Sequence, residues 1–170
     1  MDEANNAFTE PDPAERSALT RLFYRNRRPT WLGHWVSQAF CLAARLGVTP
    51  RSWVCLRVRD RVSGRMRSDA IVVPTVAGTP YVVSMFGTIS DWVQNVEAAH
   101  GDAVIAHGGS VRVRLVPVPP ADRAPILSEY VRVASSGRKH FPLPEGAPRA
   151  EFAAIAAQYP VYRIEPAADE

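Results

Sequence analysis

Residues 53–76 read WVCLRVRDRVSGRMRSDAIVVPTV, and this stretch decides the fold. In its first half Arg57, Arg59 and Arg61 alternate with Val58 and Val62, which is the period of a strand with one buried face. The Ser63-Gly64 pair then marks a turn, and a second strand is expected over residues 66–76. The stretch therefore predicts an antiparallel β-hairpin whose turn is flanked by arginines.

The rest of the chain adds more strands and several helices to this hairpin. Strands are expected at residues 53–62, 66–76, 79–85, 102–107, 110–118 and 159–164. Helices are expected at residues 30–46, 90–99, 121–135 and 149–158. Because hairpins dominate, the order predicts an α+β fold: a closed or split β-barrel, mainly antiparallel, with N-terminal and C-terminal helices.

The N-terminal region differs from the rest in composition. Residues 1–12 are polar and are predicted to be a disordered tail, which leaves 13–170 as a single domain. A short helix is expected to start at Asp12-Pro13 and to end before Pro29. The acidic start is unlike a secretory signal, so a cytoplasmic protein is expected. No apolar stretch reaches the roughly 18 to 20 residues that cross a bilayer, so no integral membrane segment is expected.

Composition narrows the range of functions. The chain is 46% hydrophobic and 22% charged, which is ordinary for a globular protein. Of 20 basic residues only Lys139 is lysine, and no basic run with interleaved aromatics favours nucleic acid. Cys41 and Cys55 have no paired histidine nearby, so no metal site is predicted. These two cysteines are expected to be buried thiols.

Two segments resemble a known family. The first is the basic hairpin from Arg61 to Arg67, RVSGRMR, and the second is VSMFG at 83–87, followed by DWVQN at 91–95. In order and spacing they resemble the deazaflavin-dependent nitroreductase and quinone reductase family. Its members use coenzyme F-420 on a split β-barrel of the FMN-binding, pyridoxamine-phosphate-oxidase-like type. Asp60, Ala70 and Phe86 stand where the family motifs have Gly, Pro and Gly.

The resemblance implies an oxidoreductase that transfers hydride between coenzyme F-420 and a small electron-poor acceptor: a nitro group, quinone, enone or imine. It implies that the cofactor lies against Arg61, Ser63, Gly64, Arg65, Met66, Arg67, Ser84, Met85, Gly87, Asp91, Trp92 and Asn95. Arginines suit the phosphodiester and the polyglutamate tail, and a helix start at residues 90–92 suits an anion. The candidate proton donors are Ser84, Tyr130, His140 and Tyr162.

Other interpretations stay open. The same barrel could use FMN. It could also lack a cofactor and bind a hydrophobic ligand or catalyse a non-redox biosynthetic step, because the Phe86 ring could fill the deazaflavin slot. The resemblance also implies a homodimer. Trp31 and Trp35 lie on a wide apolar face of the 30–46 helix, and packing on the barrel is the simpler expectation for that face than a membrane or a second subunit.

Overall fold

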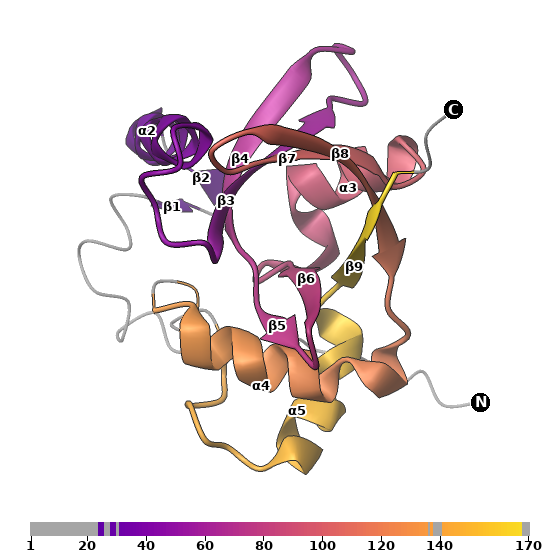
Figure 1. Ribbon diagram of the computed structural model, residues 1–170. Coiled ribbons are helices and arrows are strands. Elements are labelled where there is room, and N and C mark those ends of the chain that lie inside the picture. The colour runs from indigo at the N-terminus through magenta and orange to yellow at the C-terminus, as the bar shows by residue number, and fades with distance from the viewer. Residues whose placement is uncertain (1–23, 26–27, 30, 136, 138–140, 168–170) are drawn as a thin grey trace.

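The computed structural model describes residues 24–25, 28–29, 31–135, 137 and 141–167 (Figure 1). The expected tail at 1–12, the start of the expected first helix and His140 lie outside these residues. Strands β1 (Tyr24–Arg25) and β2 (Arg28–Pro29) pair antiparallel. The helix that was expected to end before Pro29 therefore does not include Tyr24 or Arg25. Proline disfavours helical backbone in the residue before it, and extended backbone satisfies that restriction.

One antiparallel sheet of seven strands forms the body of the protein. Its strands are β3 (Trp53–Arg59), β4 (Met66–Val72), β5 (Thr75–Val76), β6 (Thr79–Val83), β7 (Asp102–Ala106), β8 (Ser110–Pro117) and β9 (Val161–Pro166). Their order across the sheet is β4-β3-β7-β8-β9-β6-β5, and every pair in it is antiparallel. The sheet curls into a half-barrel (Figure 1). The predicted α+β split barrel is confirmed.

Four helices surround this sheet in the described residues: α2 (Trp31–Arg45), α3 (Asp91–Ala98), α4 (Ala124–Val133) and α5 (Arg149–Ile155). Short 3-10 turns lie at η2 (Gly87–Ile89), η3 (Pro120–Asp122) and η5 (Ala156–Gln158). In Figure 1, α2 lies beside β3 and β4, whereas α4 and α5 cover the opposite end near β5 and β6. None of the helices in the described part of the chain is long and apolar enough to cross a membrane.

The barrel core explains why the β3–β4 hairpin forms. Val54, Leu56 and Val58 of β3 are buried in one apolar cluster with Val93 and Leu115. The alternate residues of β3 lie on the other side of the strand, where Cys55 is buried, Arg57 is half-buried and Arg59 is exposed. Full burial of each such aliphatic side chain contributes about 1.5 to 3 kcal/mol.

A second apolar cluster lies under α4 and α5. Its fully buried members include Leu127, Val131, Phe152, Tyr159 and Val161. The cluster joins the C-terminal helices to β6 and β9, and it fixes that end of the barrel. The motifs of the resemblance lie where β3 passes into β4 and where α3 begins, and Val83 and Met85 of the second motif also contact this cluster.

Candidate functional site

The connection between β3 and β4 is longer than the sequence indicated. β3 ends at Arg59 and β4 begins at Met66, so residues 60–65 form the loop, named here the 60–65 turn. The Asp60 N–H donates to the Arg65 carbonyl at 2.8 Å, which closes the turn. The expected strand through Val62 with a two-residue Ser63-Gly64 turn is therefore wrong.

The carboxylate of Asp60 holds the 60–65 turn together. It is buried, and its Oδ1 accepts hydrogen bonds from the Ser63 N–H at 2.7 Å and the Ser63 hydroxyl at 2.6 Å. These bonds from Ser63 lower the pKa of Asp60 to about 2. Arg67 Nε lies 3.4 Å from the other carboxylate oxygen. An aspartate that bonds backbone and hydroxyl groups a few residues ahead is a turn signal, so Asp60 could have been found from sequence.

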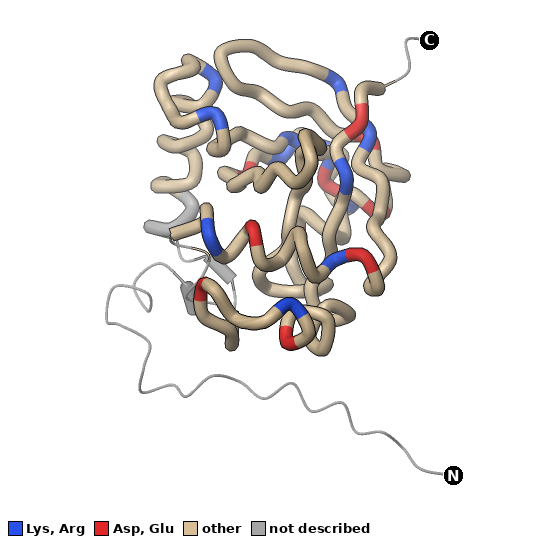
Figure 2. Tube along the Cα trace, turned by 60° about the horizontal axis from the view of Figure 1, so that its bottom comes forward, with Lys and Arg blue, Asp and Glu red and all other residues tan. Residues whose placement is uncertain are grey.

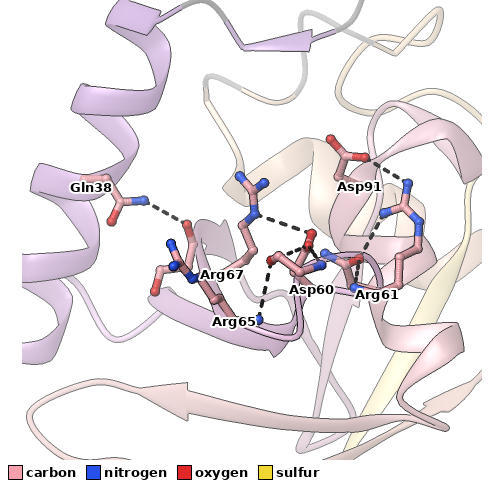
Figure 3. Close-up of polar contacts among 9 residues, drawn as sticks. Gln38, Asp60, Arg61, Arg65, Arg67 and Asp91 are labelled. Carbon is pink, nitrogen blue, oxygen red and sulfur yellow. Dashed lines mark hydrogen bonds and ion pairs between the residues drawn. The ribbon is translucent and has the colours of Figure 1, made fainter.

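Arg61 ties the turn to helix α3 (Figure 3). Its backbone N–H and its guanidinium both donate to Asn95 Oδ1, at 3.1 and 2.9 Å. The guanidinium also lies 3.3 Å from the carboxylate of Asp91, in the first turn of α3. Asn95 is only 1% exposed. The structure thus brings Arg61, Asp91 and Asn95 together, although Asn95 follows Arg61 by 34 positions in the sequence.

The loop that leads into α3 is organised by Ser84. This residue is buried, and its hydroxyl donates to the Gly87 carbonyl at 2.8 Å and bonds the Ser90 hydroxyl at 2.8 Å. Gly87 has a φ of +72°, and a Cβ there would lie 3.0 Å from the Gln158 carbonyl oxygen. Ser84 therefore fixes the approach to α3, and its hydroxyl proton is already bonded.

The two tyrosine candidates lie in different places. Tyr162 packs edge-on against Trp92, with ring centroids 5.9 Å apart. Its hydroxyl donates to Glu97 at 3.4 Å, and burial together with Glu97 raises its pKa to about 12. Tyr130 instead packs against Phe141 in the cluster under α4. The structure does not bring Tyr130 to the 60–65 turn.

The remaining candidates lie in the 60–65 turn, beside it, or in the loop before α3. Arg59 donates to the Gly64 carbonyl at 2.8 Å, a contact that the sequence did not suggest. Arg65 is exposed, and its guanidinium makes no hydrogen bond or ion pair with the described residues. Met66 is exposed at the start of β4, whereas Met85 packs partly buried against the cluster under α4.

The charge of this surface suits an anionic group. Elsewhere arginines pair closely with carboxylates, as in Arg114–Asp102 at 3.0 Å and Arg132–Glu129 at 2.6 Å. Basic and acidic positions are spread over the trace (Figure 2). Around the 60–65 turn, by contrast, four arginines (Arg59, Arg61, Arg65 and Arg67) face two carboxylates (Asp60 and Asp91). The local charge is positive.

The hydrogen bonds decide which groups could hold an anionic cofactor. The pairs Arg61–Asp91 and Arg67–Asp60 are long and each includes a well-exposed side chain, so they are weak and exchangeable. The Ser63 N–H is already bonded to the Asp60 carboxylate. The Gly64 N–H is bonded to the Asp60 carbonyl at 2.9 Å. Both backbone N–H groups of Ser63-Gly64 are thus bonded within the turn, and the guanidiniums are the groups that suit an anion. In the described residues no group of three or more potential ligands could hold a metal ion.

Comparisons with known proteins find similarity at the level of structure. No family model and no curated protein matches the sequence. One similar solved structure is a protein of unknown function from Agrobacterium tumefaciens, at 16% identity and TM-score 0.49. The match covers 75% of this chain and 53% of that one, so this chain spans about half of its length.

Two further similar structures are reductases that use coenzyme F-420. One is an F-420 reductase at 13% identity and TM-score 0.43, with 74% of this chain and 93% of that chain covered. The other is an F-420-H2-dependent reductase, FDR-A, at 17% identity and TM-score 0.45, with 68% and 95% covered. Proteins of the resembled kind are thus among the structural neighbours, and at these scores the similarity assigns no activity. Fold and site together define a split-barrel protein with an arginine-rich turn beside a helix start.

Proposed function

We propose that this protein is an oxidoreductase that transfers hydride between coenzyme F-420 and a small electron-poor acceptor: a nitro group, quinone, enone or imine. One observation carries the proposal: Arg61 joins the arginine-rich turn to the start of α3, so the two motifs of the resemblance form one surface. When bound, the deazaflavin supplies the hydride chemistry. The protein supplies binding, orientation and electrostatics.

The guanidiniums would hold the anionic tail. Arg65 is free to bind it directly, and Arg61 and Arg67 would exchange their weak ion pairs for bidentate contacts with phosphate or carboxylate. Asp60 would not leave, because its two short bonds to Ser63 hold the turn in shape. The turn therefore acts as a rigid base from which arginine side chains reach the ligand.

Two exposed apolar residues would contact the planar ring. Val62 in the turn is 85% exposed, and Ile89, two residues before α3, is 52% exposed. They belong to the two segments that Arg61 joins, so they border the same surface. Trp92, three residues after Ile89, is partly buried. Neither Val62 nor Ile89 is predicted as a contact from the sequence, because an exposed aliphatic residue has no signature until the fold is known.

Of the candidate proton donors that the structure describes, Ser84 is the one that would serve the reduction. Ser84 belongs to the loop that leads into α3, whereas Tyr130 lies in the cluster under α4. Tyr162 is 4% exposed and its phenol is bonded to Glu97, so its part would be to support Trp92. Donation from Ser84 requires that its bond to the Gly87 carbonyl be exchanged.

The test is a fluorescence titration of purified protein with coenzyme F-420. We expect quenching on binding, and Arg65→Ala and Arg67→Ala should each weaken affinity by about 1 to 3 kcal/mol, or roughly 5- to 150-fold. Arg149→Ala is the matched control, because it removes one exposed positive charge on α5, away from the turn. Absence of binding at tens of micromolar coenzyme would refute the proposal. Equal affinity in all three variants would show that the coenzyme binds away from the 60–65 turn.

A cofactor-free barrel is the second candidate function, and one observation favours it. Asp60 and Phe86 stand where the family motifs have glycine, and the Asp60 carboxylate occupies the Ser63 N–H and hydroxyl, which could otherwise bind an anion. If Phe86→Gly or Asp60→Gly creates coenzyme binding that the parent chain lacks, this second function is supported. A yellow colour on purification would instead indicate FMN.

A homodimer completes the proposal, with α2 as its contact. Trp35 and Leu42 lie on one stripe of α2, and Leu46 follows directly after the helix. These side chains are 68%, 58% and 68% exposed, so the expectation that this face packs on the barrel is wrong for Trp35. Arg45 is the basic residue of this helix, so α2 offers few cations that an anionic membrane surface could attract. An uncharged stripe is complementary to its own copy across a two-fold axis.

The dimer is tested by light scattering after size exclusion. Leu42→Glu should convert the dimer to a monomer. Val111→Glu, at a similarly exposed apolar residue of β8, should leave the dimer intact. A parent chain that is monomeric at high micromolar concentration refutes this contact.

A further inference from the structure

One side of the sheet faces away from the barrel core. Strand pairing places Arg57 of β3 beside Val104 of β7, and Val104 beside Arg112 of β8. Since directly paired residues point to the same side of an antiparallel sheet, these three side chains form one row. Adjacent positions of the same strands belong to the buried apolar cluster of the barrel: Leu56, Val58, Ala103 and Val113. The row therefore lies on the outer side of the sheet.

More arginines occupy the outer side of the same strands. Residues two apart in a strand share a side, so Arg59 continues the side of Arg57 on β3, and Arg114 continues that of Arg112 on β8. Pairing of β8 with β9 aligns Val116 with Arg163 on this side as well. We name these five residues the outer arginine face: Arg57, Arg59, Arg112, Arg114 and Arg163. Helix α2 borders the face, because the next row of the sheet, Cys55 and Ala106, is buried under that helix.

The outer arginine face carries more positive than negative charge. Along β3, β7, β8 and β9 its carboxylates are Asp102 and Glu165, and each pairs with an arginine of the face. All four side chains of these two pairs are well exposed, so the pairs are weak and exchange readily with other ligands. Arg57 and Arg112 make no ion pair within the described part of the chain. Five arginines against two carboxylates leave an excess of positive charge on this side of the sheet.

We propose that the outer arginine face is a docking surface for an acidic segment of a partner protein, a stretch of chain that carries several aspartates or glutamates. The face spans four neighbouring strands, β3, β7, β8 and β9. Strands lie about 4.8 Å apart, so the arginines extend over roughly 14 Å, which is wider than one phosphate or carboxylate. Guanidiniums bind carboxylates through paired N–H donors, and successive acidic side chains of one segment can reach them in turn.

Nucleic acid fits this face less well than a protein segment does. Trp53 lies on the same side of β3, but it packs against Phe40 of α2, with ring centroids 5.2 Å apart. The other outward positions of β3, β7 and β8 hold no aromatic residue, so bases would find nothing to stack on. Val104 and Val116 are half-buried between the arginines, where they would contact the aliphatic parts of a peptide.

The experiment measures the fluorescence anisotropy of a fluorescein-labelled oligoglutamate peptide mixed with the full chain. We expect binding that weakens as salt rises, because salt screens exposed charges. Arg112→Gln and Arg57→Gln should each weaken affinity about 2- to 5-fold, the range for exposed ion pairs, and the double variant about 4- to 25-fold. Glutamine keeps most of the side chain and removes the charge, so packing on the sheet changes little.

Arg149→Gln is the matched control, because it removes one exposed charge from α5 and should leave peptide affinity unchanged. Arg65→Gln separates this surface from the proposed coenzyme site, because it should weaken coenzyme binding and not peptide binding. If Arg57→Gln unfolds at a lower temperature than the parent, Arg112→Gln decides, since Arg112 is exposed. The proposal is overturned by no binding, by binding that salt does not weaken, by equal losses in Arg149→Gln or Arg65→Gln, or by tighter binding of a DNA duplex than of the peptide.

Discussion

Replacing Asn95 by alanine tests the join between the 60–65 turn and α3 most directly. Asn95 Oδ1 accepts from the Arg61 N–H at 3.1 Å and from its guanidinium at 2.9 Å, and the Asn95 side chain is buried. Alanine removes both bonds and adds no new polar group. The turn residues are exposed, so water can reach the freed donors of Arg61.

The size of the loss follows from these two bonds. A neutral backbone hydrogen bond contributes about 1 kcal/mol, and a bond to a charged group contributes about 1.5 to 3. The Arg61 side chain is 31% exposed, so its bond belongs at or below the lower end of that range. The sum is about 2 kcal/mol of unfolding free energy. For a domain of this size that corresponds to about 4 to 8 °C in the unfolding midpoint.

The assay is urea and thermal unfolding of Asn95→Ala beside Gln94→Ala. Gln94 is the preceding residue of α3, and its amide bonds the Thr88 carbonyl at a longer 3.3 Å on the surface. We expect Gln94→Ala to cost less than about 0.5 kcal/mol, as surface substitutions do. Equal stability of the two variants would show that Asn95 does not hold the turn.

Three other predictions concern the same end of the barrel. The pKa of Asp60 is lowered from 3.8 to about 2, so its stabilising effect is present above pH 4 and is lost as pH falls toward 2. The difference in unfolding free energy between the parent and Asp60→Asn, measured in urea, should therefore narrow over that range, and a constant difference would contradict this assignment. Gly87→Ala should lower the unfolding midpoint more than Gly64→Ala. Both glycines have positive φ, but only at position 87 would an added Cβ lie close to another atom, 3.0 Å from the Gln158 carbonyl oxygen. Equal midpoints would show that the Gln158 carbonyl does not restrict this position. The pKa of Tyr162 is raised from 10.0 to about 12, so the parent should lose stability relative to Tyr162→Phe as pH rises above 10; alkaline unfolding measures this, and parallel curves would show that the phenol is not buried.

Local patterns in the sequence were enough for most of the helices and strands and for the class of fold. The alternation of Val54, Leu56 and Val58 with outward residues is visible in the sequence because successive side chains of a strand face opposite sides. The helices α2, α3, α4 and α5 appear close to their expected ranges. Hairpin dominance indicated an antiparallel barrel, and the strand order confirms it.

Interactions between distant residues were not accessible in this way. The turn is six residues long because the Asp60 carboxylate bonds Ser63, a choice that competes with continued strand pairing. The link from Arg61 to Asn95 and the packing of Cys41 and Cys55 in one cluster both join separate elements. A sequence determines by itself which side of each element avoids water, because that depends on period alone. Which polar groups then meet depends on how the elements pack, and only the tertiary structure decides it.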